Sequence, residues 1–288
     1  MEQVYITNVE IKKVRHLQNI SIPLSENEMK HLIFTGKNGS GKTSVIEELA
    51  DYLQGIVVMG QGGEGSGLNV TFNCRDIEQK HSFLAACYKA DRTFKAQQPK
   101  HVEKVQLKNY YNVFEFPRKE FVKYLLDLKV TEALARNSQK IEKAEKIKVW
   151  FEKLEQLLKR IFADETVKLE FDDDEFEFHI LQQGKEPFDF HTLSSGYGAV
   201  LDVVLDIIMR MEYQTQRSFD FSLPGIVLID EIETHLHLEL QKNILPLLTA
   251  VFPNIQFIIT SHSPFILNSI QNAVIYDLEN HIESGNPH

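Results

Sequence analysis

The stretch "FTGKNGSGKTSVIEEL", residues 34–49, decides the fold of this chain. Gly36 to Thr43 match the pattern GxxxxGK[ST], in which glycines let the backbone turn and present its N–H groups to phosphates. The residues before it, HLIFTG, form an apolar run suited to a buried strand, and the residues after it place apolar side chains at helical spacing. The stretch therefore predicts a strand, a phosphate-binding loop and a helix whose N-terminus attracts anions.

The loop supplies most of the candidate nucleotide contacts. Lys42 is expected to reach the β- and γ-phosphates, and the Thr43 hydroxyl is expected to be a ligand of Mg²⁺. The full set of predicted contacts in the loop is Asn38, Gly39, Ser40, Gly41, Lys42, Thr43 and Ser44.

A second motif, GIVLIDEIETHLH, begins at Gly225. Its apolar run, residues 226–229, predicts a buried strand that ends at Asp230 and Glu231. Carboxylates at the carboxyl end of a parallel strand lie where a metal partner is needed. We expect Asp230 to hold Mg²⁺ and Glu231 to polarise the attacking water. The alternative is an ordinary strand that ends in acidic residues before a turn.

A third motif, NIQFIITSHSPFIL, contains a strand predicted at residues 255–260 and a histidine, His262, just past its end. A lone histidine is usually structural. At the same sheet edge as Asp230, however, His262 could hydrogen-bond the γ-phosphate and sense hydrolysis.

The fourth motif, LSSGY at residues 193–197, precedes a strongly apolar helix. Small residues at a helix start make an anion site. Read alone, the motif is only a helix cap, with Ser194 or Ser195 as the capping residue.

In this order the four motifs resemble those of ABC-type ATPases: Walker A, a signature similar to LSGGQ, Walker B with a following glutamate, and a switch histidine. The resemblance implies an α/β fold, a P-loop ABC-type ATPase with a mixed β-sheet flanked by helices, with ATP and Mg²⁺ as ligands. In that family the signature of one subunit closes on the γ-phosphate held by the other. It therefore implies a homodimer in which Ser194, Ser195 and Gly196 contact nucleotide.

Some family features are altered or unplaced in this chain. Ser195 stands where the signature has its first glycine, and Tyr197 stands where it has glutamine. The family's glutamine loop has two candidates, Gln79 and Gln97. Arg92 is a further candidate for a position near the γ-phosphate, with a surface salt bridge as its alternative role.

The sequences of the motifs indicate one branch of the family. The opening YITNVEIKKVRHLQNISIPL is similar to the first strands of the SMC/RecF branch, which implies that Arg15 approaches the nucleotide. DEIETHLH and TSHSPFIL resemble the AAA-type ATPase domains of OLD nucleases and of bacterial anti-phage ATPases such as the Septu ATPase subunit.

The pattern predicts an ATPase domain formed by residues 1–75 and 165–288, with a mainly helical lobe, residues 76–164, inserted between them. Within the lobe, residues 147–162 place apolar side chains on one face of a helix. Residues 118–160 contain 12 Lys or Arg against 7 Asp or Glu, so they could contact nucleic acid or an acidic partner. The alternative is a solvated helix face.

The region before the signature alternates and predicts a small hairpin that turns at Gln183 and Gly184. The acidic run FDDDEFE, residues 171–177, is interpreted as a solvated turn and not as a nuclease centre.

The bulk composition excludes several classes of protein. The net charge of -10 excludes a generic polyanion binder. The two cysteines form no CxxC pair, which argues against a disulfide framework. With no signal peptide and no apolar run long enough for a bilayer, we expect a cytoplasmic protein without membrane contact.

Three functions remain open from the sequence. The leading hypothesis is an ATP-hydrolysing switch that forms a nucleotide-sandwich dimer and regulates a partner effector, a nuclease or toxin of an anti-phage system. The second is a DNA repair or maintenance ATPase that binds DNA itself. The third is a nucleotide-gated scaffold with little hydrolysis.

Overall fold

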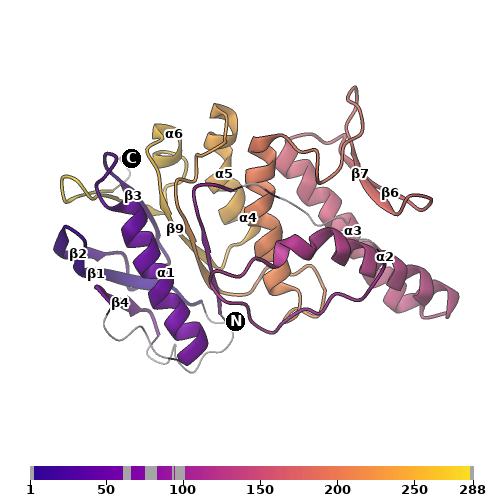
Figure 1. The fold of residues 1–288 in the computed structure, drawn as a ribbon, viewed down its shortest axis with the longest axis horizontal. Coiled ribbons are helices and arrows are strands. Elements are labelled where there is room, and N and C mark those ends of the chain that lie inside the picture. The colour runs from indigo at the N-terminus through magenta and orange to yellow at the C-terminus, as the bar shows by residue number, and fades with distance from the viewer. Residues whose placement is uncertain (1–2, 61–65, 75–82, 93, 95–100, 286–288) are drawn as a thin grey trace. The chain divides into compact units, whose positions relative to one another are not determined.

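The computed structural model describes residues 3–60, 66–74, 83–92, 94 and 101–285 (Figure 1). The chain divides into two compact units. The first unit consists of residues 1–91, 110–115 and 221–288, and the second of residues 92–109 and 116–220. Within the described ranges, no helix is both long and apolar enough to cross a bilayer.

The first unit is built on a six-stranded sheet of order β11-β10-β3-β9-β8-β5. All neighbouring strands are parallel except β11, which pairs antiparallel with β10 at one edge. The five parallel strands are largely apolar runs because both faces of the sheet are covered. Their bounds are β3 His31–Thr35, β5 Leu84–Tyr88, β8 Gly225–Ile229, β9 Ile255–Thr260, β10 Ala273–Asp277 and β11 Ile282–Gly285. The mixed sheet and its helices confirm the predicted fold class.

A smaller antiparallel sheet of order β2-β1-β4 shares one hydrophobic core with this sheet. Helix α1, Lys42–Met59, buries Val45, Ile46, Leu49 and Leu53 in that core, as its spacing predicts. The strands of the small sheet are β1 Ile6–Val14, β2 Leu17–Pro23 and β4 Leu68–Phe72. The remaining helices of the first unit are α5 Leu238–Val251 and α6 Pro264–Leu267.

A buried glutamine links the two sheets. Gln256 in β9 is fully buried, and its Oε1 accepts a hydrogen bond from the Ile6 N–H at 2.7 Å. Its Nε2 donates to the carbonyl oxygens of Ile6 at 2.9 Å and Lys30 at 2.7 Å. Because the side-chain amide is satisfied, it can lie in the core without an unpaired polar group.

The described part of the second unit contains three long helices, a 3₁₀ helix and a hairpin. The predicted apolar face of α3 is confirmed, since Ile147, Trp150 and Leu154 are among its buried residues. The bounds are 3₁₀ helix Pro117–Glu120, α2 Phe121–Asn137, α3 Ile141–Phe162, β6 Lys168–Asp172, β7 Glu177–Leu181 and α4 Ser195–Met211.

A buried carboxylate lies at the centre of the second unit. Glu212 accepts hydrogen bonds from the Tyr124 hydroxyl at 2.5 Å, the Trp150 indole at 2.9 Å and the Phe219 N–H at 3.1 Å. Burial raises the pKa of Glu212 above its usual range, and these three donors oppose that shift. Because Tyr124 and Trp150 come from α2 and α3, Glu212 joins both helices to the end of α4.

The second unit extends beyond the inserted lobe of residues 76–164. It takes in residues 165–220 because the hairpin and α4 pack with the helices of the lobe, whereas the sequence assigned them to the ATPase domain. The predicted turn at Gln183 and Gly184 is present, and after it Phe188 bridges back to Ile180. The reversal between β6 and β7 comes earlier, at residues 173–176 inside the acidic run, which we interpret from the sequence as a solvated turn.

His31 gives a pH-dependent test of the core. It is 5% exposed, and its Nδ1 accepts a hydrogen bond from the Phe257 N–H at 3.1 Å. Burial lowers the pKa of His31 from 6.5 to about 4. The folded state thus binds fewer protons than the unfolded chain, so stability is present above pH 6.5 and is lost as pH falls toward 4.

We predict that the wild type loses roughly 2–3 kcal/mol of unfolding free energy relative to His31→Gln between pH 7.5 and pH 4. Urea unfolding at several pH values measures this difference. His281→Gln, at an exposed histidine, is the matched control and should follow the wild type. Parallel pH curves for wild type and His31→Gln would contradict the prediction.

Candidate functional site

The loop between β3 and α1 has a backbone that requires glycine. Gly36, Gly39 and Gly41 have φ angles of 127°, 87° and 99°. A Cβ on Gly41 would also lie 2.9 Å from Leu17 Cδ1 in β2. These positions admit no side chain without strain, so the loop stays wrapped close to the start of α1.

The ammonium of Lys42 lies over the loop that precedes it. Lys42 is only 6% exposed, and its Nζ donates hydrogen bonds to the carbonyl oxygens of Gly36 at 2.8 Å and Lys37 at 3.1 Å. Burial lowers the pKa of Lys42, and nearby carboxylates, led by Glu231, oppose that shift. The first turn of α1 contains no acidic residue, so this helix N-terminus is suited to an anion.

The carboxylate of Asp230 is held between two threonine hydroxyls. Thr43 donates to its Oδ2 at 2.9 Å, and Thr260 donates to its Oδ1 at 2.6 Å. Asp230 follows β8, Thr260 ends β9 and Thr43 begins α1, so three elements meet at one carboxylate. The structure thus brings together the predicted metal ligands, Thr43 and Asp230.

Glu231 follows directly and has a strained backbone. Its φ angle is 44°, which an L-residue other than glycine rarely adopts. Its N–H donates to the Thr260 hydroxyl at 2.7 Å, and its Oε2 accepts from the Thr234 hydroxyl at 3.2 Å. Thr260 therefore fixes both Asp230 and Glu231 through one hydroxyl group.

His262 is exposed beyond the end of β9, and its main chain is fixed by a glutamate. The His262 N–H donates to Glu233 Oε1 at 2.6 Å. Glu233 Oε2 is buried and has no hydrogen-bond partner among the described residues. His262 thus follows β9 at the same sheet edge as Asp230, and Glu233 holds its main chain.

Thr260 and Glu233 were missed by the sequence interpretation. A signal for Thr260 was available, because it is the polar last residue of an otherwise largely apolar strand, at the end that reaches the same edge as Asp230. Glu233 carries no comparable signal, since its contact with His262 depends on the path of two loops.

Two other expectations concern the surroundings of the loop. The turn between β1 and β2 approaches it, since His16 Cε1 would lie 3.4 Å from a Cβ on Gly41. The neighbouring Arg15 is exposed and has a φ of 53°.

The glutamine-loop candidates, Gln79 and Gln97, lie outside the described residues. Strand β5 is the parallel neighbour of β8, and the Asp230 N–H donates to the Tyr88 carbonyl at 2.8 Å. The chain that leaves β5 at Lys89 therefore emerges beside Asp230.

Arg92 is 3% exposed, so the predicted surface salt bridge is wrong. Its positive charge acts instead on Asp202 in the second unit.

The signature residues belong to the second unit. Ser194 is the N-cap of α4, but its hydroxyl makes no capping hydrogen bond. Ser194 and Ser195 are exposed, whereas Gly196 is buried. The Tyr197 ring packs on Phe162 of α3, with ring centroids 4.5 Å apart, so Tyr197 anchors the start of α4.

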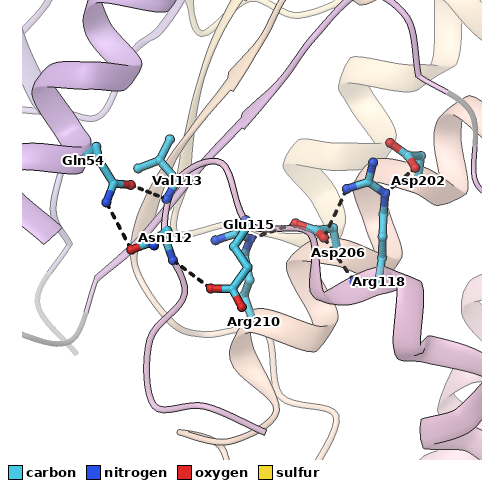
Figure 2. A network of polar contacts seen from close by, with 8 residues as sticks. All are labelled: Gln54, Asn112, Val113, Glu115, Arg118, Asp202, Asp206 and Arg210. Atoms are coloured by element: carbon cyan, nitrogen blue, oxygen red, sulfur yellow. Dashed lines mark hydrogen bonds and ion pairs between the residues drawn. The ribbon is translucent and has the colours of Figure 1, made fainter. Parts of the chain in front are cut away.

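An ion-pair network fixes α4 through two of its aspartates, Asp202 and Asp206 (Figure 2). The Arg118 guanidinium pairs with Asp202 and lies 3.4 Å from Asp206, while Arg210 Nε donates to Asp206 at 2.8 Å. Burial raises the pKa of Asp202 to about 6, and the charge of Arg118 opposes that shift. Because the sequence of α4 is strongly apolar, the contacts of its few charged residues with Arg118 could not be predicted from the sequence.

Figure 2 also shows how the segment 110–115 is held within the first unit. Gln54 of α1 accepts from the Val113 N–H at 2.7 Å and donates to Asn112 Oδ1 at 3.1 Å. The Val113 carbonyl accepts from the Cys87 N–H of β5 at 3.1 Å. The segment is therefore tied to both the Walker A helix and the neighbouring strand.

Comparison with known sequences places this chain in a family. The sequence profile described as "AAA domain, putative AbiEii toxin, Type IV TA system" matches residues 32–268. The chain belongs to this family. The matched range of this AAA domain begins in β3 and ends just beyond α6, and so contains all four motifs.

Two curated relatives are similar to this AAA domain. It is 25% identical to "Septu protein PtuA" of Bacillus mycoides (strain KBAB4), an alignment that covers 97% of this chain and 41% of that protein. It is 43% identical over 89 residues to "Retron Ec83 probable ATPase" of Escherichia coli, covering 31% of this chain and 16% of that protein. The chain thus spans less than half the length of these relatives.

Among solved structures, the AAA domain resembles an SMC head bound to the C-winged helix domain of ScpA. The TM-score is 0.52 with 14% identity, and the match covers 97% of both chains. At this identity the likeness shows the fold alone. Together the findings confirm the predicted resemblance to SMC-like and ABC-type ATPases related to defence ATPases.

The residues present fit a magnesium nucleotide. Mg²⁺ prefers oxygen ligands, and the hydroxyl of Thr43 and the carboxylate of Asp230 already lie at hydrogen-bonding distance. Lys42 and the N-terminus of α1 supply the positive charge that phosphates require. The arrangement can hold a polyphosphate next to a carboxylate, Glu231, that follows the metal ligand in the chain.

We predict that Thr260→Val lowers ATP turnover about 100-fold while nucleotide affinity changes by only a few-fold, because it releases Asp230 and Glu231 without touching the loop. Phosphate release and the binding of a fluorescent ATP analogue measure the two effects. Thr249→Val is the matched control, since its hydroxyl bonds only to carbonyl oxygens of α5. Equal turnover in the two variants would contradict the role of Thr260.

Proposed function

We propose that this AAA domain binds ATP with Mg²⁺, hydrolyses it, and acts as a switch in which two copies enclose the nucleotide. The observation that carries the proposal is the contact between Thr43 and Asp230, which joins the phosphate-binding loop to the end of β8. A purely structural loop would not need a hydroxyl and a carboxylate beside a buried lysine.

The chemistry is assigned to named side chains. Thr43 and Asp230 would hold Mg²⁺, which supplies positive charge to offset the charge of the phosphates. Lys42 binds the β- and γ-phosphates, and Glu231 accepts the proton of the attacking water. His262, exposed at the same edge, hydrogen-bonds the γ-phosphate and responds to its loss.

The enclosure of nucleotide between two copies rests on the signature. The hydroxyl of Ser194 is exposed, makes no capping bond and stands at the N-terminus of a 17-residue helix. Such a helix start can bind the γ-phosphate held by another copy. The buried ion pairs of Arg118 and Arg210 keep α4 rigid behind that contact.

The work of the switch is regulation of an effector protein, a nuclease or toxin of an anti-phage system. Support comes from similarity to proteins named for Septu and for a retron, and from the family description, which names a toxin–antitoxin system. Among the described residues, the group of three or more His, Cys, Asp or Glu side chains close enough to share a metal ion is Asp172 to Asp174, at the hairpin turn.

A second candidate function is direct DNA binding by a repair or maintenance ATPase. The excess of basic residues between 118 and 160 favours it. Several of these charges are paired along the helices, among them Lys146 with Glu142 and Arg136 with Glu132, which weakens the case. A third candidate, a scaffold that barely hydrolyses, is favoured by the altered signature at Ser195 and Tyr197.

We predict that Glu231→Gln traps a dimer when ATP and Mg²⁺ are added, because it keeps the site intact but removes the base. Light scattering after size exclusion measures the mass with and without nucleotide. Lys42→Ala should stay a monomer under the same conditions because it no longer binds the phosphates. A Glu231→Gln variant that hydrolyses ATP at the wild-type rate would refute the assigned mechanism.

We predict that ATP turnover does not respond to DNA. Turnover is measured with and without single- and double-stranded oligonucleotides at about 50 mM and 200 mM salt, a range over which phosphate contacts lose affinity steeply. Stimulation that disappears at the higher salt would favour the DNA-binding function instead. Lys140→Ala/Lys143→Ala, at exposed positions of the basic region, would then identify the surface involved.

A further inference from the structure

The second unit has a cavity that none of the predicted nucleotide-binding residues lines. It has a volume of about 400 Å³, and residues 189–191 form part of its lining. Its buried wall is apolar and comes from α2 and from two phenylalanines. These residues are Val122, Leu126, Phe178 and Phe190.

The edge of β7 faces this cavity. Ile180 exchanges two main-chain hydrogen bonds with Phe188, at 2.6 and 3.2 Å, on the side of β7 away from β6. Main-chain groups of alternate residues point the same way, so the N–H and C=O of Phe178 also face away from β6. Among the described residues the pairing with Phe188 is a single bridge, and the N–H and C=O of Phe178 make no main-chain hydrogen bond. Main-chain groups of this kind at a strand edge can pair with a further strand.

The mouth of the cavity is acidic. Glu175, Glu177 and Asp189 line it, and no Lys or Arg is among the described lining residues. The surrounding segment, residues 164–189, contains ten Asp or Glu and two Lys. The basic region, residues 118–160, has the opposite balance, although its helix α2 supplies Val122 and Leu126 to the cavity wall. A phosphate backbone would be repelled here, whereas a cationic peptide would be attracted.

We propose that this cavity and the open edge of β7 dock an extended segment of a partner protein that alternates apolar with Lys or Arg residues. The segment pairs with β7 as an added strand, places apolar side chains against Phe178 and Phe190, and brings its cations to the acidic rim. Phe176 at the rim is 47% exposed and offers a ring to those cations. Only the identification of this partner with the regulated effector rests on the proposed function.

The test uses the full chain without nucleotide, so that its result is independent of ATP binding. The probes are fluorescent acetylated hexapeptides in which Lys or Arg alternates with Val, Ile or Leu, measured by anisotropy at low salt. Glutamate versions of the same peptides test the charge. Versions with alternate main-chain amides N-methylated test strand addition without altering the protein.

Some cationic peptides should bind, and Glu175→Gln/Glu177→Gln should weaken their binding about tenfold, as loss of rim charge does. Asp173→Asn/Asp174→Asn is the matched control on the same hairpin, outside the lining, and should weaken it less than twofold. N-methylation should abolish binding.

Failure of every peptide, equal binding of the glutamate versions, or indifference to N-methylation would overturn the proposal. Displacement of the peptide by an oligonucleotide would assign the surface to nucleic acid. A dimer that forms without nucleotide and is disrupted by Glu175→Gln/Glu177→Gln would assign it to a second copy of this chain. Either result would also overturn it.

Discussion

The carboxylate of Asp230 is the constraint on which the site depends. Both of its oxygens are engaged by threonine hydroxyls, one from the start of α1 and one from the end of β9. Helix α1 and strand β9 each pack in the core independently of Asp230. The carboxylate, however, fixes the start of α1 relative to the end of β9. The same Thr260 hydroxyl also accepts a hydrogen bond from the Glu231 N–H, which fixes the backbone of Glu231. Three hydrogen bonds thus align the loop, the predicted metal ligand Asp230 and the predicted base Glu231.

Features that depend on one continuous stretch of sequence could be predicted. Features that depend on which strands lie side by side in the fold could not. The glycine loop, the strands at 226–229 and 255–260, and the apolar face of α3 each occupy one continuous window, and the structure has all of them. Thr260 becomes part of the site only because β9 lies next to β8, an adjacency that no single window contains. Roles of individual residues in binding and catalysis remain predictions.

The differences from the sequence interpretation have physical causes. The chain reverses between β6 and β7 at 173–176, where the acidic residues are solvated, and it reverses again at the predicted turn of Gln183 and Gly184, so the one hairpin expected has two turns. Arg92 is buried and its charge acts on Asp202, whereas the sequence interpretation placed it in a surface salt bridge. Residues 165–220 belong to the second unit, in which Glu212, just after α4, accepts hydrogen bonds from Tyr124 of α2 and Trp150 of α3.

The left-handed backbone of Glu231 has a consequence for how this protein could change over time. A glycine would relax that conformation, whose strain costs on the order of 1 kcal/mol or more for a residue with a side chain. Selection for folding alone would therefore favour replacing the one carboxylate assigned to proton transfer. Glu231 is kept only if selection for its function outweighs the stability that a glycine would give. Where that selection is absent, we expect Glu231 to be replaced before the residues of the glycine loop. Copies of the gene would then decay into proteins that still bind nucleotide but no longer turn it over.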